Sequence, residues 1–69
     1  MVRYPFVLRP RTPLYAAAAP RSEASPVAPG LRVRRLSKTK GDDGRLWAKV
    51  ETEDGRTGFV PAKALRMSK

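Results

Sequence analysis

The sequence contains neither cysteine nor histidine. Without cysteine, the chain has no disulfide framework and no thiolate ligand for a metal ion. Without histidine, it lacks the commonest general base, the commonest metal ligand and the side chain that titrates near neutral pH. Its carboxylates cluster at turns and its serines have no visible base, so the usual routes to acid–base or nucleophilic catalysis are missing. We therefore expect a protein that is not an enzyme, with no catalytic residues, no metal site and no cofactor.

Long hydrophobic runs are also missing. No apolar stretch approaches the roughly 20 residues that a membrane-spanning helix needs, so we expect no transmembrane segment. The nearest approach to a secretory signal is residues 4–8, an apolar stretch that Arg9, Pro10 and Arg11 interrupt at once. A signal peptide needs about 7–15 apolar residues, and none is identified. The expected location is cytoplasmic, with the cell envelope as the alternative if a longer precursor is processed.

Acidic residues are few. Six Asp and Glu stand against fifteen Lys and Arg, which gives a formal charge of +9 on 69 residues. A field of this sign favours anionic partners such as nucleic acid or acidic protein surfaces, although a solvated basic surface is the simpler interpretation. Part of the positive charge is concentrated in one segment, which we call the basic stripe: Arg32, Arg34, Arg35, Lys38 and Lys40.

Helix signals are nearly missing as well. Seven prolines and five glycines interrupt the chain at short intervals, which favours short strands and indicates one small all-β domain. Leu31, Val33 and Leu36 are expected on the core side of one strand. The dipeptide Asp54-Gly55 predicts a hairpin turn. The expected strands are residues 2–8, 14–19, 31–36, 47–50 and 57–60, with polar loops at 20–30 and 37–45 and a single 3₁₀ turn within 62–65.

The run LWAKV at residues 46–50, the Asp54-Gly55 turn and the run TGFVPAKAL at residues 57–65 carry a recognisable pattern. This pattern resembles the bacterial SH3-like (SH3b) family, which ends in a Trp-x-Lys-Val strand, a glycine turn, a Gly-aromatic-Val-Pro strand and a leucine. The resemblance implies a five-stranded SH3-like barrel over residues 12–66. Residues 1–11 are then an N-terminal extension or extra edge strand, and residues 67–69 a tail. Independently, Gly55 suits the positive φ of a turn and Gly58 a crowded position.

The resemblance also implies a ligand groove. Tyr15, Trp47 and Pro61 match three positions of the pocket that binds proline-rich peptides in eukaryotic SH3 domains. Ala17 and Ala64 stand where two further aromatic residues would be, so recognition of the usual PxxP peptides is not expected. Two interpretations of Trp47 stay open: a core residue, or a groove residue beside Tyr15.

The N-terminal segment has its own pattern. Val2, Tyr4, Phe6 and Leu8 alternate with other residues, which predicts an extended strand with one apolar face. Pro5 restricts this strand to a sheet edge or to a docking position, because proline lacks an N–H. The segment is therefore either a docking arm that adds a strand to a partner protein or an extra strand of the chain's own barrel.

These features favour a non-catalytic protein-interaction module. We expect an accessory or structural subunit that docks on a larger assembly through its aromatic groove and N-terminal arm. One alternative is nucleic-acid binding through the basic stripe together with Tyr15 and Trp47. The other is binding to the cell envelope, to peptidoglycan or its stem peptides. The identity of the partner and the oligomeric state stay open.

Overall fold

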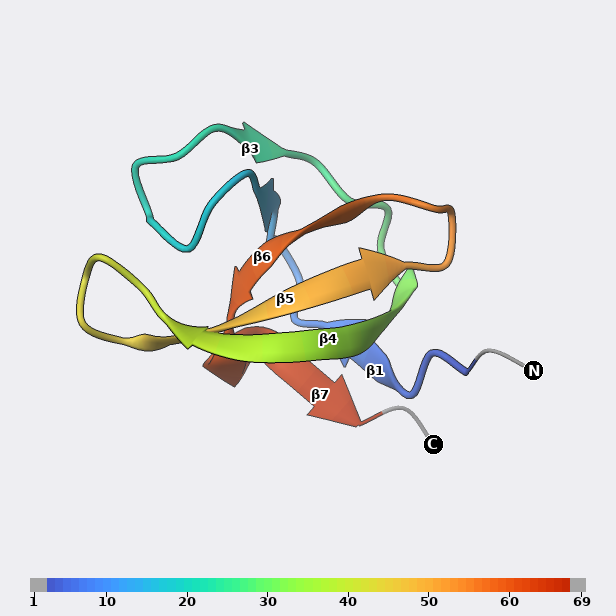
Figure 1. Cartoon of the computed structure of the whole chain (residues 1–69). Helices are drawn as coiled ribbons and strands as arrows, with labels where there is room; N and C mark the ends of the chain where they lie inside the picture. The colour runs from blue at the N-terminus through green and yellow to red at the C-terminus, as the bar shows by residue number, and fades with distance from the viewer. Residues whose placement is uncertain (1–2, 68–69) are drawn as a thin grey trace.

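Three antiparallel strands form the centre of the structure (Figure 1). The computed structural model describes residues 3–67. Strand β4 (Arg32–Lys40) pairs with β5 (Leu46–Thr52), and β5 pairs in turn with β6 (Thr57–Pro61). β5 is therefore the middle strand of this central group.

Four short strands complete the sheet, and one 3₁₀ turn lies between its last two strands in the sequence. Its strand order is β3-β2-β6-β5-β4-β1-β7, every neighbouring pair is antiparallel, and the sheet curls into a half-barrel. Over residues 3–67 the fold is all-β, as the sequence predicts, and no helix there is long and apolar enough to cross a membrane. The shorter elements are β1 (Phe6–Leu8), β2 (Leu14–Tyr15), β3 (Ala24–Ser25), the 3₁₀ turn η1 (Ala62–Ala64) and β7 (Leu65–Met67).

The curled sheet encloses a small apolar core. Val33, Val50 and Val60, one from each central strand, have no exposed surface. β-Branched side chains fit this pleated surface, and each fully buried valine contributes roughly 1.5–3 kcal/mol through removal of apolar area from water. The rest of the core consists of the buried Leu14 and Ala48 and the partly buried Phe6, Leu8, Val27 and Leu65.

The turn between β5 and β6 confirms the prediction made for Asp54-Gly55. Gly55 has a φ of +93°, and its N–H donates to the Thr52 carbonyl at 3.0 Å. The buried Thr52 hydroxyl donates to the Asp54 carboxylate and accepts from the Arg56 N–H at 2.9 Å. The hydroxyl of Thr52, and next the charge of Arg56, lower the pKa of Asp54. Side-chain hydrogen bonds therefore stabilise this turn in addition to its glycine.

Gly58 occupies the crowded position that the sequence predicts. It is buried, and a Cβ there would collide with the Leu14 side chain and lie 2.9 Å from the Tyr15 carbonyl oxygen. The crowding comes from β2, which pairs antiparallel with β6 where Tyr15 lies opposite Phe59. A glycine at residue 58 thus allows β2 to join the sheet.

The structure has seven strands where the sequence predicts five. Strand β3 lies within the predicted loop 20–30, and its two residues are exposed, so no hydrophobic alternation marks it. Strand β7 begins at Leu65, where the 3₁₀ turn is predicted to end, and it includes Met67 of the predicted tail. Strand β3 forms by pairing with β2 and β7 by pairing with β1, and neither pairing is encoded in the hydrophobic pattern of the strand itself.

Strand β4 is longer than the sequence predicts. Residues 37–40, expected in a loop, pair with β5 instead, and the turn itself begins at Gly41. A bulge between Arg35 and Ser37 shifts the register of the two strands. The inserted Leu36 is 43% exposed, so the prediction that it faces the core is wrong.

The N-terminal strand β1 lies inside the sheet. It pairs with β4 on one side, where Phe6 lies opposite Val33, and with β7 on the other, where Phe6 lies opposite Met67. The prediction of an edge position is therefore wrong, because β7 covers the side that would otherwise be free. Pro5 lies just before the strand, so its missing N–H removes no ladder hydrogen bond.

Candidate functional site

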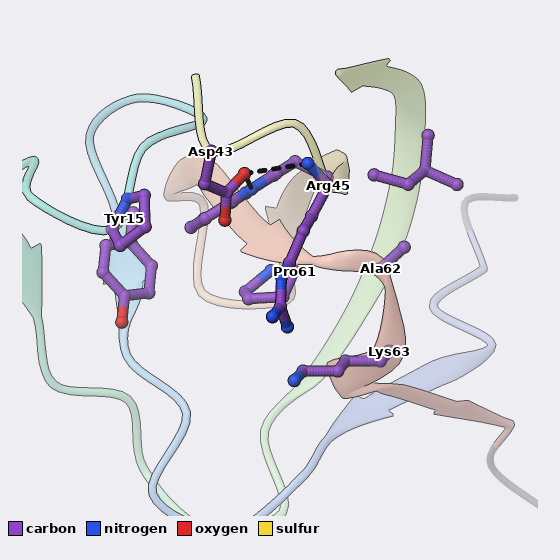
Figure 2. A pocket seen from close by; sticks show the side chains of 9 residues that line it. Tyr15, Asp43, Arg45, Pro61, Ala62 and Lys63 are labelled. Carbon is purple, nitrogen blue, oxygen red and sulfur yellow. Dashed lines mark hydrogen bonds between the residues drawn. The ribbon is translucent and has the colours of Figure 1, made fainter. Parts of the chain in front are cut away.

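A groove lies where the ends of β2, β5 and β6 meet the 3₁₀ turn η1 (Figure 2). Its volume is about 750 Å³. The lining combines apolar surface with charged side chains, and Figure 2 shows Lys63 pointing across the groove in the direction of Tyr15. The lining residues are Tyr15, Pro20, Asp43, Arg45, Leu46, Trp47, Pro61, Ala62 and Lys63.

Trp47 forms the buried base of this groove. Along β5, Ala48 and Val50 point into the core, so Trp47 points to the opposite face of the sheet. It is nevertheless only 2% exposed. The Tyr15 ring packs against it edge-to-face, with ring centroids 5.2 Å apart and planes at 87°. Trp47 is thus buried on the groove side, outside the main apolar core.

The carboxylate of Asp43 fixes the indole of Trp47. Asp43 Oδ1 accepts a hydrogen bond from Trp47 Nε1 at 3.0 Å and another from the Arg45 backbone N–H at 3.0 Å. These two bonds, first that of the Arg45 N–H and then that of the indole, lower the pKa of Asp43 against the opposing effect of desolvation. At neutral pH the group is therefore a carboxylate that holds both the turn and the indole.

Gly41 closes the far side of the tryptophan. It is buried, and a Cβ at this position would collide with the Trp47 ring and lie 2.7 Å from the Ala18 carbonyl oxygen. The next residue, Asp42, donates its backbone N–H to that same carbonyl at 3.0 Å. The turn between β4 and β5 is thereby connected to the loop that follows β2, and the two loops enclose the indole together.

A second hollow continues the groove toward the N-terminal part of the chain. The two hollows share Tyr15, Pro61 and Lys63, so we treat them as one groove. The second hollow adds Arg9 and Arg11, both exposed, next to Pro10, Thr12, Pro13 and Ala64.

The structure brings together the three groove residues that the sequence predicts. Tyr15, Trp47 and Pro61 come from three different strands and line the same hollow. Ala64 lines the adjacent hollow, whereas Ala17 lines neither. The groove therefore has one partly exposed aromatic ring, that of Tyr15, above a buried one.

The basic stripe lies elsewhere. None of its five residues lines the groove. Arg34 lies opposite Glu51 and forms an ion pair with it, with Nε 2.6 Å from Oε1. Arg35 lies opposite Val50, on the other face of the β4–β5 ribbon. The stripe is therefore divided between two faces and does not form one continuous surface with Tyr15 and Trp47.

The predicted docking arm contributes to the chain's own sheet. Phe6 and Leu8 belong to β1 and pack against the core, and Tyr4 is half-buried. Val2 lies outside the described residues. The side chains of Phe6 and Leu8 are therefore already committed to the fold.

Sequence reasoning missed the polar residues of the groove. Asp43 belongs to the Gly-Asp-Asp-Gly segment, which the sequence marks only as a turn, and its spacing of four residues from Trp47 was the available signal. Arg45 and Lys63 carried no signal beyond their charge. Within residues 3–67 there is no cluster of three or more carboxylate, histidine or cysteine side chains that could hold a metal ion.

Comparison with known proteins identifies no relative of this chain. No family model matches the chain, and no curated protein or solved structure matches it. The groove itself is therefore the basis for assigning a function.

Proposed function

We propose that the protein is a non-catalytic interaction module with an SH3-like barrel, which binds a partner protein through the groove. The barrel assignment is supported by the order of elements along the chain. Strand β2, the long loop that contains β3, then β4, β5 and β6, the turn η1 and β7 follow one another as in the family that the sequence resembles. In this proposal β1 and β3 are additions to a five-stranded unit.

The observation that carries the functional proposal is the convergence of Tyr15, Trp47 and Pro61 on one groove. Several kinds of peptide-binding domain use a groove lined by aromatic residues, and protein interfaces generally have aromatic anchors at the centre and polar groups at the rim. Here Pro61 and the ring of Tyr15 give an apolar floor, and Lys63 stands at the rim. The buried indole makes this floor rigid, which lowers the entropy lost on binding.

A non-catalytic role fits the chemistry of the lining. The groove contains a single carboxylate, that of Asp43, and this group is occupied by two hydrogen bonds. General acid–base work needs a group that is free to exchange a proton with a ligand. Asp43 is better suited to holding the groove in shape.

Docking through the N-terminal arm is not part of this proposal, since Phe6 and Leu8 pack in the chain's own core. An accessory subunit would instead use the groove and leave the sheet intact. Attachment to a larger assembly, a cytoplasmic location and the cell-envelope alternative all stay predictions.

Nucleic-acid binding is the second candidate, and the charge of +9 favours it. Non-specific binders of single strands combine a cationic groove with aromatic rings on which several bases stack. In this groove Trp47 is 2% exposed and cannot stack on a base, which leaves only Tyr15. We therefore prefer the protein partner.

Selection from a displayed library of random peptides tests the proposal. The bait is the full chain, and each selected peptide is measured again on Tyr15→Leu, which keeps an apolar cover over Trp47 but removes the ring. Leu36→Ser is the matched control, because Leu36 is exposed and lies outside the groove. We expect the selected peptides to bind Tyr15→Leu at least about tenfold more weakly than the unaltered chain. Their affinity for Leu36→Ser should equal that for the unaltered chain. The proposal would be contradicted if Tyr15→Leu left the affinity of the selected peptides unchanged, or if no peptide were selected.

A further inference from the structure

Positively charged residues outnumber negatively charged ones in the groove. Across its two hollows the lining contains four cations and one carboxylate. The carboxylate is Asp43, at the wall next to Trp47. The cations are Arg9, Arg11, Arg45 and Lys63.

The one carboxylate is already used within the protein. Oδ1 of Asp43 accepts from both the indole of Trp47 and the backbone N–H of Arg45. A ligand cation would have to compete with the Trp47 bond, and breaking that bond would leave a buried indole N–H without an acceptor. The groove is therefore poorly equipped to bind a positively charged ligand.

The four cations, by contrast, are available. Within the described chain the structure contains two ion pairs, Arg34–Glu51 and Arg56–Asp54, and neither includes a groove cation. Arg9, Arg11 and Lys63 are exposed, so their charges face solvent and can meet a ligand. Arg45 and Lys63 extend over the groove beside Pro61 (Figure 2).

The backbone at Arg11 gives a second observation. The Thr12 N–H donates to the Arg9 carbonyl at 3.2 Å, which makes residues 9–12 a turn with Pro10 second and Arg11 third. Arg11 has a φ of +63°, in the left-handed region where a turn of this kind favours glycine. An arginine that lines the groove is thus held in an unfavourable backbone conformation. Such strained residues concentrate at binding sites, where surrounding structure maintains them.

We infer that the groove selects an extended peptide segment rich in Asp and Glu, whose carboxylates meet Arg9, Arg11, Arg45 and Lys63 while its apolar residues contact Tyr15 and Pro61. This inference rests on the proposed function and adds the chemistry of the partner. A single strand of nucleic acid matches the cations equally well but finds only the ring of Tyr15 for stacking, since Trp47 is buried.

The test compares three fluorescein-labelled peptides by fluorescence anisotropy on the full chain. They share one proline- and alanine-rich core and differ only in their flanks, which carry Glu, Gln or Lys. A labelled oligothymidylate is measured alongside them. Lys63→Ala and Lys49→Ala are a matched pair of variants, because both remove an exposed lysine and only Lys63 lines the groove.

We expect the Glu peptide to bind at least about tenfold more tightly than the Gln peptide, with the Lys peptide weakest of all. Lys63→Ala should weaken the Glu peptide by about two- to fivefold, as for an exposed charge pair, and Lys49→Ala should leave it unchanged. The preference should shrink between about 0.1 M and about 1 M salt, where the screening length falls from about 10 Å to about 3 Å.

The contradicting outcomes separate the two proposals. Equal binding of the Gln and Glu peptides, with loss on Tyr15→Leu, overturns the charge selectivity and keeps the interaction module. Equal effects of Lys63→Ala and Lys49→Ala show attraction by net charge alone and overturn the inference. Tight binding of the oligothymidylate with no binding of any peptide overturns both proposals.

Discussion

Gly41→Ala tests whether the tryptophan is as tightly enclosed as the structure indicates. The φ of Gly41 lies outside the left-handed region, so alanine introduces no backbone strain there, and the whole effect must come from its methyl group. That methyl would collide with the Trp47 ring and lie 2.7 Å from the Ala18 carbonyl oxygen. Overpacking of this kind costs about 1–3 kcal/mol.

The size of this effect is large for so small a protein. At about 0.05–0.15 kcal/mol per residue, a chain of 69 residues has an unfolding free energy of roughly 3–10 kcal/mol. The loss should lower the melting temperature by at least about 4 °C. Urea titration followed by circular dichroism gives the free energy, and the NMR resonance of the Trp47 indole N–H reports whether its bond to Asp43 survives.

Gly44→Ala is the matched control. Gly44 has a φ of +79° and open space around it, so alanine there costs about 1–2 kcal/mol through backbone strain alone. Both variants should lose stability, but only Gly41→Ala should shift the indole resonance. A loss below about 0.5 kcal/mol for Gly41→Ala, or an unshifted indole, would refute the enclosure that we describe.

Three further predictions concern stability. Arg11→Gly should raise the unfolding free energy by up to about 1 kcal/mol in urea titration, because it relieves the positive φ of +63°, whereas Arg9→Gly should give no gain; a destabilised Arg11→Gly would contradict this. Val60→Ala should cost about 2 kcal/mol in the same assay, since Val60 has no exposed surface, and a loss under about 0.5 kcal/mol would count against the assigned core. The folded-state pKa values of Asp43 and Asp54 are lowered, so their stabilisation is complete above the ordinary carboxylate pKa of about 4 and is lost as the pH falls through the lower folded values. Urea midpoints measured between about pH 6 and pH 2 should therefore decline below about pH 4, and less so in Asp43→Asn; an identical decline in that variant would contradict the role of Asp43.

The sequence predicts those parts of the fold that local chemistry determines. Asp54-Gly55 favours a tight turn through its own backbone preferences, and glycine at residue 58 leaves room for β2 beside β6. The groove residues Tyr15, Trp47 and Pro61 were found through the resemblance, which carries information on tertiary position that a single local pattern lacks. The predicted all-β class follows from the frequent proline and glycine residues and holds for residues 3–67.

The remaining features depend on how the strands pair and how their turns place side chains, which residue types alone do not encode. Strand β3 has two exposed residues and exists only because β2 lies beside it. Leu36 looks like a core residue by spacing, but a bulge in β4 turns it outward, and no residue in the sequence marks that bulge. Asp43 looks like an ordinary turn residue until the fold brings its carboxylate to the indole of Trp47.

The same distinction applies to charge. The basic stripe is conspicuous along the chain, yet β4 and its bulge distribute it between two faces, and Arg34 is paired with Glu51. The groove cations are scattered in the sequence, and only the fold brings Arg9 and Arg11 to the same groove as Lys63. Linear charge clustering was therefore a poor guide to the charged surface.

Titration of the isotopically labelled chain with the Glu-flanked peptide, followed by NMR, tests the central claim most directly. The Trp47 indole N–H lies at the base of the groove and is a single resolved reporter, because the chain has one tryptophan. We predict saturable shifts of this resonance and of the backbone amides of Tyr15 and Lys63, with little change at Arg35 and Lys38 of the basic stripe. Shifts centred on the stripe, with the indole unmoved, would contradict the claim that this groove is the binding site.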